Sequence, residues 1–168
     1  MRNILKILKF KTIAFVVLIT LIPCYKILAN ENNFSVNGID YGISSGEMEF
    51  YGNWYGNNAN NIDLTLEGSN IEIYLEMFVP NNSDRLVAGT YNLVESDNPM
   101  PFTYFSGDMA VNDKDFFYIV HGTVVVSVAG SGNNAVYTIT LDCTLTDENG
   151  DIAGTIKGTY RGTLTWND

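Results

Sequence analysis

Hydrophobic and polar residues alternate without a break through residues 152–166. One side of this stretch carries Ile152, Gly154, Ile156, Gly158, Tyr160, Gly162, Leu164 and Trp166, and the other side carries Ala153, Lys157, Arg161 and threonines. A period of two places one set of side chains on each face of a pleated strand, so the stretch predicts a long β-strand with a buried face. The glycines lie on that buried face, where they allow the strand to bend or a neighbouring ring to approach the backbone. We therefore expect a coiled sheet that closes on itself.

Shorter stretches with the same alternation fill the rest of the chain after residue 30. The expected strands are residues 34–43, 47–56, 62–66, 71–79, 90–94, 102–109, 115–128 and 136–146, followed by the last one. Clusters of turn-forming residues, such as Asn149 with Gly150, separate them. No helical period appears after residue 30, so the expected secondary structure is entirely β.

These elements predict an all-β domain, an antiparallel meander of about eight to nine strands. The connections are too short for the crossovers that a parallel sheet requires. A meander of this length hides its edges either by closing into a barrel or by folding into two packed sheets. Because of the long coiled strands with inward glycines, we expect a barrel or a barrel-like sandwich.

The first 29 residues have the pattern of a secretory signal peptide. Four basic residues, Arg2, Lys6, Lys9 and Lys11, precede an uncharged apolar run over residues 13–23. That run is shorter than the roughly 20 residues of a membrane span and fits the apolar core of an export signal. We expect cleavage after Ala29, which leaves residues 30–168 as a single domain in the periplasm or outside the cell.

Cys24 offers a second exit from the signal. A cysteine at the end of an apolar run can be lipidated in bacterial lipoproteins, and the domain is then anchored to the outer membrane. Pro23 directly before it fits this processing poorly, because its ring fixes the backbone. We therefore favour cleavage after Ala29.

Removal of residues 1–29 makes the protein strongly acidic. The mature chain keeps four of the nine basic residues and all nineteen acidic ones, so its formal charge falls from −10 to −15. Such a surface repels phosphate backbones, which argues against nucleic acid as a partner. Cys143 is the single cysteine that remains, so no intramolecular disulfide can form.

Three segments carry a resemblance to a known group of proteins. They are Gly89-Thr90-Tyr91-Asn92-Leu93, the hairpin with His121-Gly122-Thr123-Val124 and Tyr137-Thr138-Ile139, and Gly158-Thr159-Tyr160-Arg161-Gly162-Thr163-Leu164. With these the mature chain resembles secreted or lipid-anchored β-meander domains of Bacteroidota, some of them lipocalin-like. The resemblance implies an exported β-barrel and brings no catalytic residue with it.

No group of residues in the sequence indicates an enzyme, and we expect no cofactor. His121 has no orienting partner or nucleophile at a suitable spacing, and its strand pattern groups it with Phe117 and Ile119. Cys143 falls on the buried face of its strand with Tyr137, Ile139, Leu141 and Leu145, where a thiol behaves as a small hydrophobic group.

One acidic cluster is a candidate calcium ligand. Asp147, Glu148 and Asp151 surround Asn149 and Gly150, and oxygen-rich loops of this kind can hold calcium. The spacing differs from that of an EF-hand loop, and Asn-Gly is a strong hairpin signal. We interpret the cluster as a solvated turn and predict no metal site.

The aromatic residues form the more informative set. If Met48, Phe50 and Trp54 face the core, four other rings face outward on neighbouring strands: Tyr51, Tyr55, Tyr74 and Phe78. Exposed rings on a sheet can stack on sugars or anchor a protein. The alternative is that another part of the chain covers this face, either residues 34–43 or the loop before Phe102.

Two functions follow as hypotheses. The first is an exported, non-enzymatic domain that binds a glycan or a protein at the cell surface through those four rings. The alternative is a lipocalin-like carrier of a small apolar ligand, with room beside Tyr160 and Trp166 left by the inward glycines. Against the carrier, Phe50, Trp54 and Trp166 are large enough to fill a small barrel. The sequence leaves the oligomeric state open.

Overall fold

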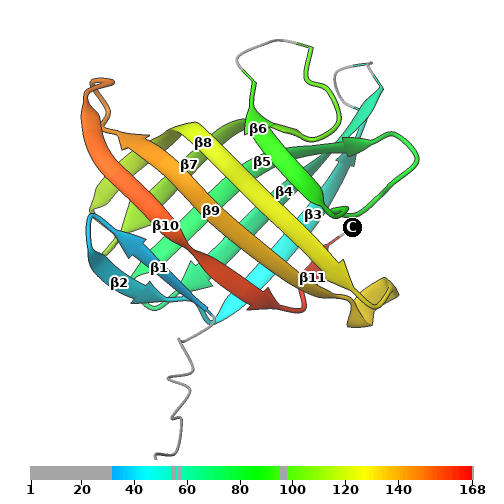
Figure 1. Cartoon of the computed structure of the whole chain (residues 1–168), viewed down its shortest axis with the longest axis horizontal. Helices are drawn as coiled ribbons and strands as arrows, with labels where there is room; N and C mark the ends of the chain where they lie inside the picture. The colour runs from blue at the N-terminus through cyan, green and yellow to red at the C-terminus, as the bar shows by residue number, and fades with distance from the viewer. Residues whose placement is uncertain (1–31, 54–55, 57, 95–97, 168) are drawn as a thin grey trace, which may run out of the picture.

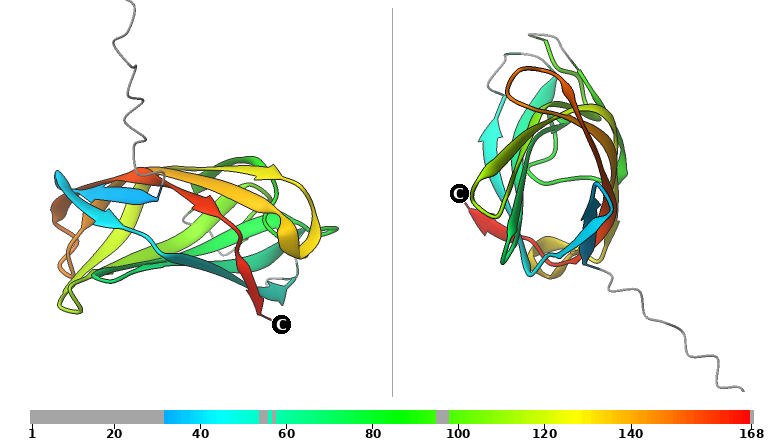
Figure 2. Two further views of the ribbon diagram at one scale, coloured as in Figure 1. Left: turned by 90° about the horizontal axis from the view of Figure 1, so that it is seen from below. Right: turned by 90° about the vertical axis from the view of Figure 1, so that its left-hand side faces the viewer.

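The computed structural model describes residues 32–53, 56, 58–94 and 98–167, and these residues form a closed β-barrel with extra strands (Figures 1 and 2). The strands are β1 (Asn33–Val36), β2 (Ile39–Gly42), β3 (Ser45–Gly52), β4 (Ala59–Gly68), β5 (Ile71–Pro80), β6 (Gly89–Leu93), β7 (Thr103–Val111), β8 (Asp115–Ala129), β9 (Val136–Thr146), β10 (Ile152–Gly162) and β11 (Thr165–Asn167). A short 3₁₀ turn, η1 (Gly132–Asn134), joins β8 to β9. The predicted all-β class and barrel-like architecture are confirmed.

The strands follow the order β11-β3-β4-β5-β7-β6-β8-β9-β10-β1-β2 in one sheet. Most neighbours are antiparallel, as the meander requires, but β6 lies between parts of β7 and β8 and pairs in parallel with β7. The last strand, β11, also pairs in parallel, with β3. The purely antiparallel meander is therefore wrong at these two short contacts.

Eleven strands appear in the described ranges, against the eight or nine expected, because two predicted strands divide. Residues 34–43 turn back on themselves at Asn37 and Gly38, whose φ angles of 52° and 83° make a tight hairpin. The last predicted strand ends at Gly162, and Trp166 continues in β11 opposite Met48 of β3. The Tyr160 hydroxyl donates to the Thr163 carbonyl at 2.7 Å and stabilises this break.

A β-bulge changes the predicted face of Ile152. The register between β9 and β10 shifts between Ile152 and Gly154, so the strand has one extra residue there. Ile152 is therefore 80% exposed, although the alternation placed it in the core. From Ile156 onward the alternation holds, and Ile156, Tyr160 and Leu164 are buried.

Gly158 does what the inward glycines were expected to do. A Cβ atom built there meets the Phe34 Cα at 2.6 Å and a Phe34 ring carbon at 2.7 Å. Phe34 is fully buried in β1, which pairs with β10 at this point. The glycine thus lets the β1 backbone and its ring lie directly against β10.

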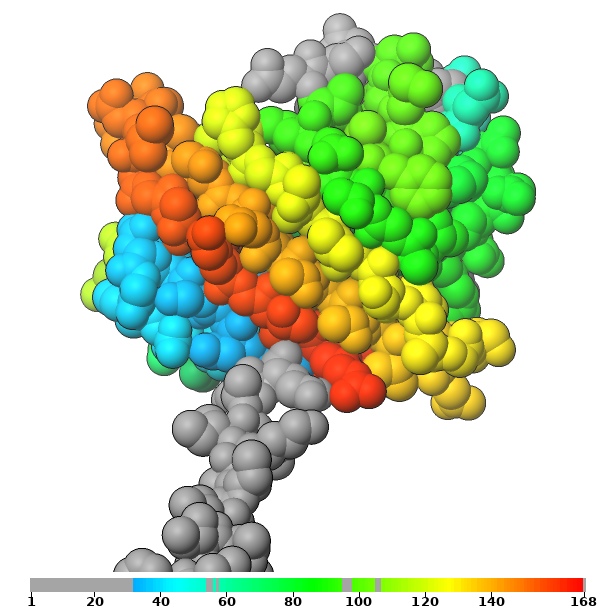
Figure 3. Space-filling view, viewed as in Figure 1, coloured from blue at the N-terminus to red at the C-terminus, as the bar shows by residue number. Residues whose placement is uncertain are grey.

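Large side chains fill the barrel interior. The largest fully buried side chains include Tyr91, Tyr104, Phe34 and Phe78, and all except Phe78 belong to the central core cluster. Space-filling in this way is usual for small barrels. Figure 3 shows the outer surface of β8, β9 and β10 with the β1–β2 hairpin packed beside β10.

The segment between β5 and β6 packs against one end of the barrel. Leu86 enters the core, and the Asn60 side chain donates to the carbonyls of Asn81 at 3.1 Å and Ser83 at 2.9 Å. The Arg85 guanidinium lies 4.7 Å from the centre of the Trp166 ring. The outer faces of β3, β4 and β5 lie on a different side of the barrel from those of β8, β9 and β10 (Figure 1).

Candidate binding face on β3, β4 and β5

The four rings predicted to form a binding face have different environments. Tyr51 is 47% exposed, at a bulge of β3 between Phe50 and Gly52. Tyr74 is half-buried on the outer side of β5. Phe78 is completely buried, so its predicted exposure is wrong, and Tyr55, like Trp54, lies outside the described residues.

Phe78 is buried because the outer face is covered at the ends of β4 and β5. Its neighbours Ala59 and Asn61 on β4 are also buried, and so is Pro99 in the loop before β7. The Phe102 amide donates to the Phe78 carbonyl at 2.8 Å, which ties that loop to β5. The covering loop before Phe102 was one of the two alternatives, whereas residues 34–43 pair with β10 and insert Phe34 into the core.

The part of this face that remains open is a row of carboxylates. Glu49, Asp63 and Glu76 lie directly opposite one another on β3, β4 and β5. Glu67 and Glu72 form a second opposed pair on β4 and β5, four residues along from Asp63 and Glu76. Like charges directly opposite in a sheet are destabilising, by roughly 0.2–1 kcal/mol a pair relative to neutral residues. The row therefore lowers the stability of the free protein.

The described residues of β3, β4 and β5 include no lysine or arginine. The basic residues of the described chain are Arg85, Lys114, Lys157 and Arg161. Arg85 lies at the barrel end, and Lys157 of β10 pairs with Asp142 of β9 at 3.0 Å. The strands that carry the row thus supply no basic residue of their own.

Two tyrosines contact the carboxylates. The Tyr74 hydroxyl donates a hydrogen bond to Asp63, and the Tyr51 hydroxyl donates one to Glu49. Burial, and then the charge of Glu49, raise the pKa of the Asp63 carboxyl, although the Tyr74 hydrogen bond acts in the opposite direction. Burial and the bond to Asp63 raise the pKa of the Tyr74 hydroxyl well above its ordinary value. Asp63 is therefore a partly desolvated acid, and it is held in place by a neutral donor.

Two acceptors within this group have no donor. The Asn61 side chain is 7% exposed and gives its amide N–H to Glu76 Oε1 at 2.9 Å, but its own Oδ1 accepts nothing. Asp63 Oδ1, two residues along on the same face, is also buried without a partner. A buried group left without its hydrogen bond costs about 1–3 kcal/mol, so such groups call for an explanation. Together they are able to accept N–H or O–H donors from a ligand.

Sequence reasoning missed Asn61, Asp63, Glu49 and Glu76 as a group. Each occupies a polar position of its strand, which reads as ordinary solvent exposure. Their common feature is the register that sets Asp63 opposite both glutamates, and alternation along one strand carries no information about register. The available signal in the sequence was the acidic residues at the polar positions of these strands.

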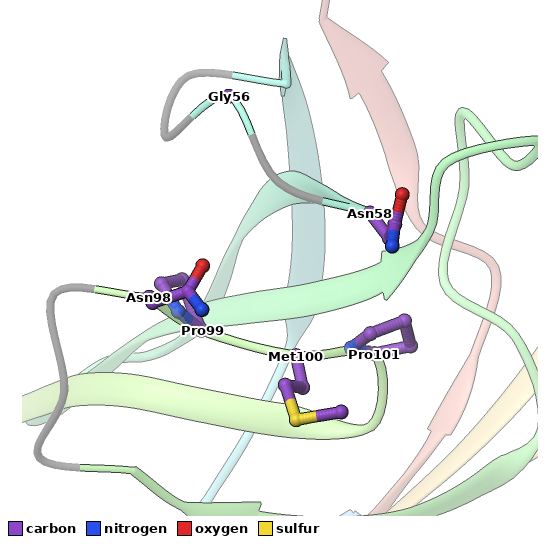
Figure 4. Close-up of a pocket in the computed structure, with 6 residues that line it drawn as sticks. All are labelled: Gly56, Asn58, Asn98, Pro99, Met100 and Pro101. Atoms are coloured by element: carbon purple, nitrogen blue, oxygen red, sulfur yellow. The ribbon is translucent and has the colours of Figure 1, made fainter.

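A surface pocket of about 320 Å³ lies between two loops beyond this face (Figure 4). Its lining residues are Gly56, Asn58, Asn98, Pro99, Met100 and Pro101. Met100 is 65% exposed, and none of the described lining residues is titratable. This described lining offers contact area for a bound molecule.

In the acidic turn at residues 147–151, the Asp147 carboxylate accepts hydrogen bonds from the turn's own backbone. Asp147 accepts the amides of Asn149 at 2.9 Å and Asp151 at 3.0 Å, and these bonds lower the pKa of the Asp147 carboxyl. Among the residues that the structure describes, no group of three or more His, Cys, Asp or Glu side chains is arranged to hold a metal ion. The turn is a hairpin that Asp147 closes.

His121 and Cys143 differ in how well alternation placed them. The register of β8 shifts between Ile119 and His121, so His121 is exposed and does not share a face with Phe117 and Ile119 as predicted. Cys143 is buried as expected, 3.9 Å from the Tyr104 hydroxyl, and burial raises the pKa of its thiol.

Comparison with known proteins adds no relative. No protein-family model matches the chain, and searches of curated proteins and of solved structures give no significant match. The resemblance to Bacteroidota β-meander domains therefore stays a prediction. In the described ranges, no helix has the length and hydropathy to cross a membrane.

Proposed function

We propose that this protein is an exported, non-enzymatic domain that binds a basic protein segment at the cell surface through the outer faces of β3, β4 and β5. The observation that carries the proposal is the opposed row Glu49, Asp63 and Glu76, which has no basic residue of the described chain on its strands. A binding partner with lysine or arginine side chains relieves the repulsion, so complex formation gains the free energy that the free sheet loses.

A glycan was the other partner named from the sequence. Sugar stacking needs a platform of open rings, and of the four predicted rings Phe78 is buried and Tyr74 bonds to Asp63. Of the predicted rings that the structure describes, Tyr51 is the one with an exposed side chain. Carboxylates therefore dominate the open face, and they favour a cationic partner.

The carrier hypothesis gains no specific support. The interior positions that would contact an apolar ligand hold Tyr91, Tyr104, Phe34 and Met48. We therefore base the proposal on the outer face.

Fluorescence anisotropy with a labelled arginine-rich peptide tests the proposal on the mature domain. The matched probe has citrulline, a neutral isostere, in place of each arginine. We expect the arginine peptide to bind and the citrulline peptide to fail, with affinity falling as salt rises from about 0.05 M to about 0.5 M because exposed charges are screened. An affinity that does not change with salt concentration contradicts the proposal. So does a glycan ligand found on an array when the basic peptide does not bind.

A further inference from the structure

The row of carboxylates contains one spot with more than charge to offer. Asn61 Oδ1 and Asp63 Oδ1 are both buried and both without donors, on the same outer face of β4. Residues two apart on a strand lie roughly 6.6 Å apart, so their side chains can converge on one small group. The Asn61 amide N–H is already taken by Glu76, which fixes Oδ1 as the free end.

We propose, building on the proposed function, that Asn61 and Asp63 form the binding site for a single guanidinium group, so that the partner is recognised through one arginine. The site is a specific pair of hydrogen-bond acceptors within the acidic face. Glu49 and Glu76, opposite Asp63, supply the remaining negative charge.

The chemistry of the acceptors favours arginine over lysine. A guanidinium presents five N–H donors in a flat fork and is weakly hydrated, so it can satisfy separate acceptors in a half-buried place. An ammonium is a compact and strongly hydrated point charge, so it gives up more hydration than a guanidinium when it enters a half-buried place. Two separate unpartnered oxygens therefore match the fork.

The aromatic neighbours fit the same group. Tyr51 is exposed, and its hydroxyl donates to Glu49, which lies opposite Asp63. Guanidinium planes stack on tyrosine rings. The two orphan oxygens are shielded from solvent, so a guanidinium reaches them only when the side chains above them move.

The test is an NMR titration of the mature ¹⁵N-labelled domain with N-acetyl-arginine amide and, separately, N-acetyl-lysine amide. We expect the arginine probe to bind about tenfold more tightly than the lysine probe, since hydrogen bonds to a charged group are strong. Asp63→Asn keeps the side-chain shape and should weaken arginine binding about tenfold. Glu72→Gln is the matched control, because it removes one charge from the same face outside the pair, and it should change affinity less than twofold.

Asn61→Leu is a second variant, which keeps a branched side chain of four heavy atoms but removes the orphan Oδ1 together with the N–H given to Glu76, and it should weaken arginine binding as Asp63→Asn does. Equal affinity for the two probes, or equal losses in Asp63→Asn and Glu72→Gln, overturns the arginine site and leaves a diffuse acidic face that still binds basic peptides. If neither probe nor the arginine-rich peptide binds, the arginine site and the proposed function both fail.

Discussion

At the scale of single residues, Asp63 stands out as an acid that weakens its own fold. It is partly buried, opposite Glu49 and Glu76, and one of its oxygens has no donor. Residues of this kind persist when the bound state needs them, because binding sites often reduce stability. Its effect on stability can be measured without any ligand.

We predict that Asp63→Asn stabilises the free domain at pH 7 by roughly 0.2–1 kcal/mol, the size of a like-charge repulsion across a sheet. The pKa of Asp63 is raised in the folded state, so the folded protein takes up this proton first as the pH falls. Protonation removes the penalty, and the wild type gains stability from the raised pKa down to the ordinary value near 3.8. Urea unfolding of both proteins from pH 7 to pH 4 measures the difference, which should shrink with falling pH.

Asp142→Asn is the control for this prediction. Asp142 forms an exposed ion pair with Lys157, so its loss should leave stability unchanged or lower it by less than about 1 kcal/mol. An Asp63→Asn variant that is less stable than the wild type at pH 7 contradicts the account of Asp63.

Residue positions could be predicted from the sequence where the alternation was undisturbed. Cys143 and Ile139 face the core as expected, because β9 pairs with β10 in regular register from Leu145 to Tyr137. Phe78 could not be placed, since its burial comes from a loop distant in sequence that bonds to its carbonyl. The unpartnered Oδ1 of Asn61 could not be predicted either, because it depends on the contact between the Asn61 amide and Glu76 on the neighbouring strand.

At the scale of elements, the strands themselves were predictable and their phase was not. The period of two identified β5, β8 and β9 almost to the residue. Each bulge then adds one residue, so the alternation before it is out of phase with the alternation after it, as at Ile152 and His121. A bulge depends on pairing between two strands, so one strand's sequence does not reveal it.

The close approach of β1 to β10 gives a prediction at this scale. Gly158→Ala should destabilise the domain by about 1–3 kcal/mol, because the added Cβ meets the Phe34 backbone, which cannot move without separating the strands. Gly42→Ala in β2 is the matched control, since nothing lies within 4 Å of its added Cβ and its φ is not positive.

Thermal or urea unfolding of the two variants makes the comparison. Gly42→Ala should be neutral or slightly stabilising, through the smaller entropy of its unfolded chain. If both variants are as stable as the wild type, the packing of β1 against β10 does not require a glycine at position 158.

At the scale of the whole molecule, the sequence led to a barrel because long alternating strands with short turns must hide their edges. The barrel is present. Its parallel contact between β11 and β3 was beyond prediction because it joins segments far apart in sequence, and the one between β6 and β7 because it depends on how β6 fits between β7 and β8. The location of the domain is a separate whole-chain prediction, and it concerns residues 1–29, outside the described residues.

Intact mass of the exported protein tests that location. We predict a mature chain that begins at Asn30 and carries no lipid, recovered in the soluble periplasmic or extracellular fraction. A mass that starts at Cys24 and includes a diacylglycerol group contradicts this and places the domain on the membrane surface.

The central claim is that the outer face of β3, β4 and β5 binds a basic partner, and the most direct measurement is a map of that contact. A ¹H–¹⁵N NMR titration of the mature domain with the arginine-rich peptide reports every backbone amide at once. We predict that the largest shifts fall around Glu49, Asp63 and Glu76, that they saturate, and that the citrulline peptide produces none. Shifts centred on β8, β9 and β10, or no shifts at low salt, contradict the account.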